Sequence, residues 1–181
     1  YGYDPWGFNT AVARRTLNGT FGATHEYPAG RDTWAFAVGD LSGDGRPDIA
    51  TANHGRSSIS VLVNRGDGSF GTTVEYRTDL GPRTIAIGDV NGDHKADVVT
   101  GNGSSDPSGE TDWIDSISVF LGKGDGALLP DRPYRPRGRY SLSSRQFITV
   151  RIGDVNGDRK PDLVTADTGD ALDPHQFRFA L

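Results

Sequence analysis

Short runs of alternating apolar and polar residues recur along the chain, and no stretch sustains the 3.6-residue period of a helix. The large residues Trp34, Phe36 and Val38 alternate with alanines, which is the two-residue period of a strand. Brief apolar runs bounded by Gly, Asp and Pro predict further strands at residues 48–52, 59–63, 97–101, 117–121 and 162–166. The pattern therefore predicts an all-β protein built from short strands and many turns.

One segment occurs three times, and its copies organise the whole chain. The copies are GDLSGDGRPDIATAN from Gly39, GDVNGDHKADVVTGN from Gly88 and GDVNGDRKPDLVTAD from Gly153. The first two are each followed by an apolar strand pattern and a Gly-Asp-Gly turn, which is a strong hairpin signal. A four-stranded antiparallel unit of roughly 40–50 residues has the size of a β-propeller blade.

The repeat predicts one region, residues 1–181, with two complete blades and a partial blade at each end. A strand near Val12 and another from Thr20 precede the first full unit, and a further strand is expected at residues 176–181. The predicted units are a partial blade at 1–28, blades at 33–76 and 83–134, and a partial blade at 147–181.

Composition places the acidity in loops and excludes several function classes. The formal net charge is -5, which provides no electrostatic footprint for nucleic acid. Of the 24 acidic residues, only Glu26, Glu75 and Glu110 are glutamate, and aspartate favours turns and hard-cation sites. The absence of cysteine excludes disulfides and thiol chemistry. No apolar run reaches the ~20 residues of a membrane span.

Each Asp-rich segment carries oxygen-bearing side chains at alternate positions. Position one is Asp, position three Ser or Asn, position five Asp, and position nine Asp again. Calcium takes several oxygen ligands in a flexible geometry, and a short loop of this kind can wrap such an ion. The candidate ligands are Asp40, Ser42, Asp44 and Asp48; Asp89, Asn91, Asp93 and Asp97; and Asp154, Asn156, Asp158 and Asp162.

These segments resemble FG-GAP or VCBS repeats, the blades of integrin-α-like propellers. The pairs Phe21-Gly22 and Phe70-Gly71 match the Phe-Gly element of that family, whereas its Gly-Ala-Pro element is only approximated by residues 80–82. The resemblance implies an extracellular protein, secreted or at the cell surface, with about three Ca²⁺ ions. It also implies that position seven of each loop supplies a backbone carbonyl ligand, from Arg46, Lys95 and Lys160.

Two other interpretations of the loops stay open. Each loop can be an Asp/Asn/Gly turn whose side chains bond only their own backbone, although nine carboxylates repel one another without a cation. EF-hand or dockerin loops begin in the same way but need an acidic residue at position twelve. Thr51, Thr100 and Thr165 stand there, and a strand follows instead of a helix. Position six is Gly45, His94 and Arg159, so a positive φ would strain the second and third loops.

Two insertions, one within the second complete blade and one between it and the next unit, are expected at the sheet edge opposite the Asp-rich loops. We expect a glycan or protein ligand there, with Trp113, Arg137 and Tyr140 in contact with it. The function predicted is therefore recognition, without catalysis. The alternatives are a polysaccharide-active, lyase-like enzyme on a propeller scaffold and a structural protomer of an extracellular assembly. Open strand edges in the partial blades can recruit another chain, which predicts self-assembly.

Overall fold

The computed structural model describes residues 9–15, 20–30, 32–103, 115–134 and 149–166. Within these residues the chain is all-β, apart from one three-residue 3-10 turn, η1 (His54–Arg56). None of the described helical structure is long and apolar enough to cross a membrane. The strands are β1 (Asn9–Arg15), β2 (Phe21–Pro28), β3 (Thr33–Gly39), β4 (Asp48–Asn53), β5 (Ser58–Leu62), β6 (Val74–Arg77), β7 (Pro82–Gly88), β8 (Asp97–Gly103), β9 (Asp115–Phe120), β10 (Arg132–Tyr134), β11 (Thr149–Gly153) and β12 (Asp162–Ala166).

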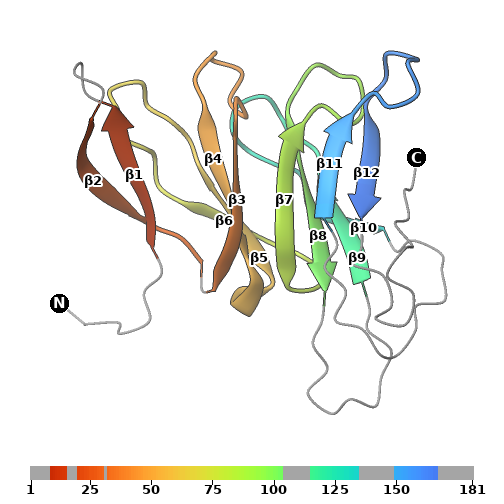
Figure 1. The fold of residues 1–181 in the computed structure, drawn as a ribbon, viewed down its shortest axis with the longest axis horizontal. Coiled ribbons are helices and arrows are strands. Elements are labelled where there is room, and N and C mark those ends of the chain that lie inside the picture. Colours follow the sequence, from red (N-terminus) through yellow and green to blue (C-terminus); the bar gives the residue numbers. More distant parts are fainter. Residues whose placement is uncertain (1–8, 16–19, 31, 104–114, 135–148, 167–181) are drawn as a thin grey trace, which may run out of the picture.

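The strands form two four-stranded antiparallel sheets and two hairpins, consistent with the predicted blades. The first blade has the order β3-β4-β5-β6 and the second has the order β7-β8-β9-β10. The N-terminal hairpin pairs β1 with β2, and the third blade pairs β11 with β12. The sheets stand side by side along the longest axis of the molecule (Figure 1). The all-β, propeller-like fold predicted from the repeat is confirmed.

The fourth strand of each complete blade is short and is preceded by an isolated bridge. Phe70 and Leu128 join their sheets only through single bridges, to Asn64 and Gly122, and β6 and β10 begin several residues later. The Gly-Asp-Gly turn, whose glycines have positive φ values, lies between the two residues of each bridge. The predicted strand at residues 176–181 lies outside the described residues.

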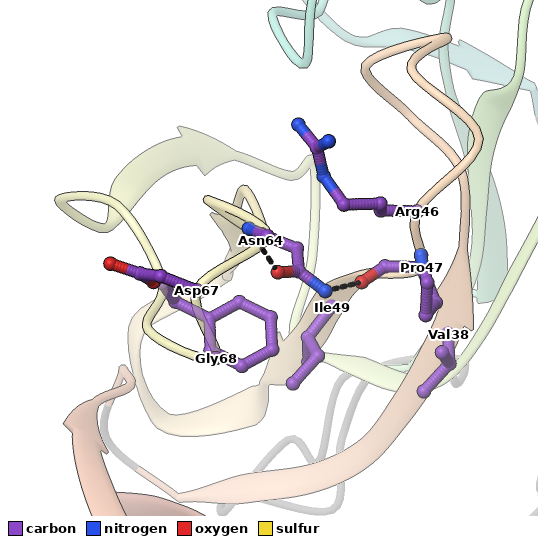
Figure 2. A pocket seen from close by; sticks show the side chains of 9 residues that line it. Val38, Arg46, Pro47, Ile49, Asn64, Asp67 and Gly68 are labelled. Carbon is purple, nitrogen blue, oxygen red and sulfur yellow. Dashed lines mark hydrogen bonds between the residues drawn. The ribbon is translucent and has the colours of Figure 1, made fainter.

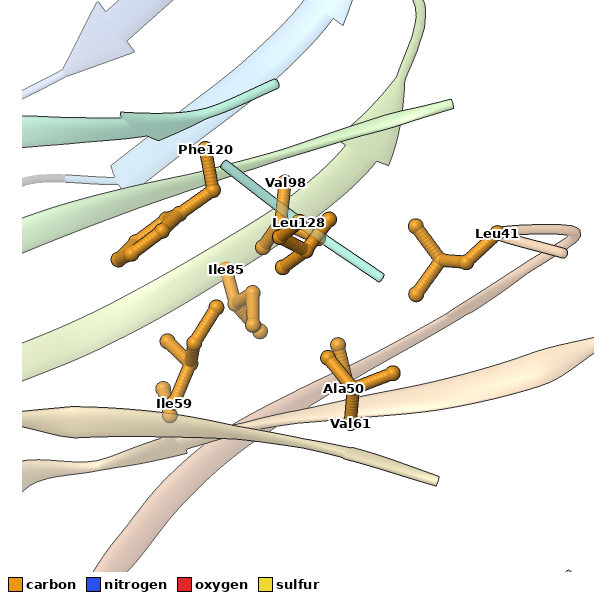
Figure 3. Close-up of a cluster of buried hydrophobic side chains, with 9 residues drawn as sticks. Leu41, Ala50, Ile59, Val61, Ile85, Val98, Phe120 and Leu128 are labelled. Atoms are coloured by element: carbon orange, nitrogen blue, oxygen red, sulfur yellow. The ribbon is translucent and has the colours of Figure 1, made fainter. Parts of the chain in front are cut away.

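Blades pack on one another through their apolar faces. The central cluster joins Ala50, Ile59 and Val61 of the first blade to Val98 and Phe120 of the second, all nearly inaccessible to solvent (Figure 3). A second cluster joins Val99 and Ile117 of the second blade to Val150 of the third. Small residues on one blade face large residues on the next, so the sheets approach closely and exclude water.

A buried polar network occurs in both complete blades. In the first, the Asn53 Oδ1 atom accepts from the Thr51 hydroxyl at 3.0 Å, and its Nδ2 donates to the Ser60 hydroxyl at 2.8 Å. Asn102 makes the same bonds with Thr100 and Ser118, at 2.7 and 2.8 Å. Each network ties the second strand of a blade to the third with its polar groups satisfied, as burial requires.

Candidate functional site: the Asp-rich hairpin loops

The three Asp-rich loops connect the first and second strands of the three blades. They lie at one edge of the row of sheets, at the top of Figure 1, whereas η1 lies at the opposite edge. Register places Gly39 opposite Asp48, Gly88 opposite Asp97 and Gly153 opposite Asp162, so each loop starts from the same position of its hairpin. The repeat in the sequence is therefore a repeat in structure.

Position one binds the backbone of its own loop. The Asp40 carboxylate accepts N–H bonds from Gly43 at 2.7 Å and Gly45 at 2.8 Å. These bonds, with that from Gly45 the strongest influence, hold the pKa of Asp40 below its ordinary value. At Asp89 burial acts to raise the pKa, but the N–H bonds led by that from His94 outweigh it, so this pKa is also lowered. Both carboxylates are therefore anionic near neutral pH.

Positions four and six of the loops both have a left-handed backbone, although only position four is glycine in all three loops. Gly43, Gly92 and Gly157 have φ of 72°, 79° and 82° at position four. Position six also has positive φ, at 81° for Gly45 but 64° for His94 and 66° for Arg159. A side chain in this left-handed region is strained. The positive φ on which the predicted strain of the second and third loops depends is confirmed.

Position five differs between the first two loops. The Asp44 carboxylate accepts an N–H bond from Arg46 and also forms an ion pair with the Arg46 guanidinium. The Asp93 carboxylate accepts the Lys95 N–H at 2.9 Å, which leaves acceptor capacity because a carboxylate has about four acceptor positions. Asp93 is therefore the cleaner probe of cation binding.

Position nine has a structural task that the sequence analysis missed. Asp48 is fully buried, and its Oδ2 accepts the Leu41 N–H at 2.9 Å while its Oδ1 accepts the Asn64 N–H at 2.8 Å. Asp97 holds Val90 and Gly122 in the same way, at 2.9 and 2.7 Å. This carboxylate joins the loop to the end of the third strand. Its fixed position before an apolar run is the sequence signal that could have indicated this role.

The donor chemistry of the loops suits a hard divalent cation, since every candidate side-chain donor is an oxygen. In the described residues, however, no three acidic or histidine side chains are gathered closely enough to hold a metal ion. The carboxylates at positions one and nine are turned toward backbone N–H groups instead. The structure thus shows the turn that the calcium-loop and the metal-free interpretations both require. In each loop the carboxylates are close in sequence but accept bonds from different backbone N–H groups.

The opposite edge holds the other candidate surface. Trp113, Arg137 and Tyr140 lie outside the described residues. On the described part of this edge, Arg56, Ser58, Glu75 and Arg77 line a polar pocket of about 280 Å³. Nearby, the Trp34 ring stacks on the His54 ring at a centroid distance of 4.5 Å.

Arg83 shapes the charge of this opposite edge. Its guanidinium lies 5.6 Å from the centroid of the Trp34 ring. Burial, and then the positive charge of Arg83, lower the pKa of His54 below its ordinary value. His54 is therefore neutral near pH 7.

Comparison with known families and structures agrees with this fold. Residues 40–100 match the model of the FG-GAP-like repeat, from the first Asp-rich loop into β8. The predicted FG-GAP resemblance is thereby confirmed for these residues. A search of curated proteins finds no match.

Among solved structures, the chain is similar to a chain of the Tc holotoxin pore of Photorhabdus luminescens. The TM-score is 0.51 at 14% sequence identity, over 96% of this chain. The chain corresponds to only 8% of the length of that neighbour. At this identity the likeness concerns the fold alone.

Proposed function

We propose that the chain is an extracellular β-propeller module that binds calcium through its Asp-rich loops and recognises a glycan or protein ligand. The observation that carries the proposal is the threefold repetition of one loop geometry at one edge of the molecule. Residues 40–100 are an FG-GAP-like repeat, and repeats of this kind commonly bind Ca²⁺. In this proposal the loops stabilise the scaffold, and the opposite edge contacts the ligand.

Electrostatics supports a cation at these loops. The lowered pKa values of Asp40 and Asp89 keep both carboxylates ionised, and the acidic residues at positions five and nine of each loop lie within a few residues of them. Ionised carboxylates this close in one short loop repel one another, and a bound divalent ion relieves that repulsion. Affinities near 10⁻⁴–10⁻³ M, on the order of those of extracellular modules, are expected.

Thermal unfolding with calcium, with magnesium and with a chelator tests the calcium step. Binding to the native state alone adds about 2.7 kcal/mol per site at a hundredfold excess over Kd. Asp93→Ala should remove part of the calcium-dependent gain. Its matched control is Asp125→Ala, because Asp125 lies at the same edge of the same blade and likewise accepts one N–H at 2.9 Å, from Ala127. Coincident wild-type melts in calcium and chelator would refute this step.

The recognition step concerns the edge that carries Trp34 and the pocket of Arg56 and Arg77. The two arginines and the carboxylate of this pocket are groups that can hydrogen-bond to acidic or hydroxyl-rich ligands. A glycan array probed with the wild type and with Arg56→Ala/Arg77→Ala tests it. Loss of the same signals in the variant is expected, whereas unchanged signals would place recognition elsewhere.

Binding without catalysis is part of the proposal. Incubation with acidic and neutral polysaccharides distinguishes a binding module from a lyase-like enzyme. Retention of the polysaccharide without new reducing ends or unsaturated products is the expected result. Accumulation of such products, at a rate proportional to protein concentration, would establish the enzyme alternative.

A further inference from the structure

At the contact between the first and second blades, an apolar side chain of the first blade inserts among apolar side chains of the second. Leu41, at position two of the first Asp-rich loop, is 1% exposed and belongs to the cluster shared with the second blade. Its carbonyl accepts the Gly126 N–H at 3.0 Å. Close to it, Ile87 of the second blade packs on Gly39, where an added Cβ would lie 2.7 Å from the Ile87 Cγ2 atom.

The contact between the second and third blades repeats the close approach at glycine. Ile152 packs on Gly88, where an added Cβ would lie 3.2 Å from the Ile152 Cδ1 atom. Val90, the position-two residue of the second loop, packs against the cluster that joins these blades. The rule of packing is thus a glycine and a position-two apolar residue on one blade against a large apolar residue on the next.

The third blade presents the same two features to solvent. Val155, at position two of its loop, is 55% exposed. An added Cβ at Gly153 would meet no atom within 4 Å, unlike at Gly39 and Gly88. This face therefore has the apolar position-two residue, Val155, and the glycine, Gly153, of the repeated contact. Among the described residues, nothing packs on them.

The outer face of the first blade has the large apolar residues that would complete this contact. Val38 corresponds to Ile87 and Ile152, and Phe36 corresponds to Ile85, because each precedes the Gly-Asp pair by the same number of residues. Ile85 is 5% exposed, whereas Phe36 and Val38 are 68% and 56% exposed. Beside them a groove of about 510 Å³ is lined by Val38, Pro47, Ile49 and Phe70, among others (Figure 2). Their counterparts in the second blade, Ile87, Ala96, Val98 and Leu128, surround Leu41 within one cluster.

From these equivalences we propose that two copies of this chain associate head to tail. Val155 of one copy occupies the groove of the other, as Leu41 does in the second blade, and Val38 packs on Gly153. Gly68 then donates its N–H to the Val155 carbonyl, as Gly126 donates to Leu41. The contact joins different surfaces of the two copies, so it builds a ring or a filament according to the rotation between them.

Two further features fit a second copy. The third blade contributes β11 and β12, in the roles of first and second strands, and the hairpin β1–β2 follows the pattern of third and fourth strands. Side by side across two copies they reproduce the strand order of a complete blade. Arg151 stands where the complete blades carry Ala37 and Ala86. Its guanidinium can cover the exposed Phe36 ring by a cation–π contact.

Cysteine pairs test the geometry cleanly, since the chain contains no cysteine. An added Cβ at Gly88 would lie 3.6 Å from the Ile152 Cβ, within the span of a disulfide. Gly88→Cys/Ile152→Cys is therefore the intrachain positive control. Val38→Cys mixed with Gly153→Cys should give an intermolecular disulfide under mild oxidation. Val74→Cys, exposed on β6, mixed with Gly153→Cys is the negative control.

Light scattering on the wild-type chain at rising concentration measures the assembly itself. Val155→Asp changes an exposed side chain, so its melting temperature in dilute solution should match the wild type while its association weakens at least tenfold. A wild-type chain that stays monomeric at high micromolar concentration, or a Val38→Cys and Gly153→Cys mixture that forms no more disulfide than the control, overturns the proposal. Neither readout uses a glycan ligand.

Discussion

The two complete blades have the same strand order and nearly the same motifs, yet they differ in how much of each is covered. The second blade is packed on both faces, by the first blade and by the third. The first blade is packed against the second on one face, and its other face carries exposed Phe36 and Val38, although Tyr27 of the N-terminal hairpin touches Phe70. Equivalent residues thus differ more than tenfold in exposure, at 5% for Ile85 and 68% for Phe36. Burial in a repeat protein is a property of the neighbour as much as of the blade.

The largest expected difference concerns this equivalent pair. Ile85→Ala should lower the free energy of unfolding by about 2–5 kcal/mol, because it opens a cavity between two blades. Phe36→Ala should change it by less than about 0.5 kcal/mol in dilute solution, as is usual at an exposed site. Chemical denaturation of both variants measures the two values. Equal losses would mean that the outer face of the first blade is covered in solution even when the chain is monomeric.

The sequence predicted the repeated unit well, because its turns and strand periods are local signals. Gly43 and Gly92 require their turn, and Asp48 and Asp97 start their strands as predicted. The bond from Asn64 to Asp48 joins residues distant in the chain, and so does the packing of Leu41 against the second blade. No local pattern distinguishes Phe36 from Ile85, since both are large apolar residues at the same position of a strand. The candidate loops were therefore predictable, whereas their internal bonding and the open groove were not.

The buried asparagine networks predict a similarity between the blades in place of a difference. Asn53 is 0% exposed and Asn102 is 1% exposed, although only the second blade is covered on both faces. Asn53→Ala and Asn102→Ala should each cost about 1–3 kcal/mol, because the serine and threonine hydroxyls lose a buried partner. Thermal and chemical denaturation of the pair gives the comparison. A loss confined to Asn102→Ala would show that burial of this network depends on the neighbouring blade.

The Asp-rich loops provide a smaller and reciprocal test. His94 has a φ of 64° where the first loop has Gly45 at 81°. His94→Gly should raise the free energy of unfolding by about 0.5–1 kcal/mol by relieving left-handed strain, and Gly45→His should lower it by a similar amount. Measurement in chelator separates backbone strain from metal binding. Opposite signs in the two loops are required, and a gain from both substitutions would exclude strain as the cause.

The smallest expected effect is a pH dependence that belongs to the first blade alone, since Gly103 replaces His54 at the equivalent position of the second. Burial, and then the charge of Arg83, lower the pKa of His54 in the folded protein. The unfolded chain, with an ordinary value near ~6.5, therefore takes up the proton first as the pH falls. The contribution of neutral His54 to stability is complete above that value and is lost progressively below it. His54→Phe keeps a ring against Trp34 and removes the titration. Between pH 7.5 and 5.5 the wild type should lose more melting temperature than this variant, and parallel pH profiles would show that His54 does not sense pH.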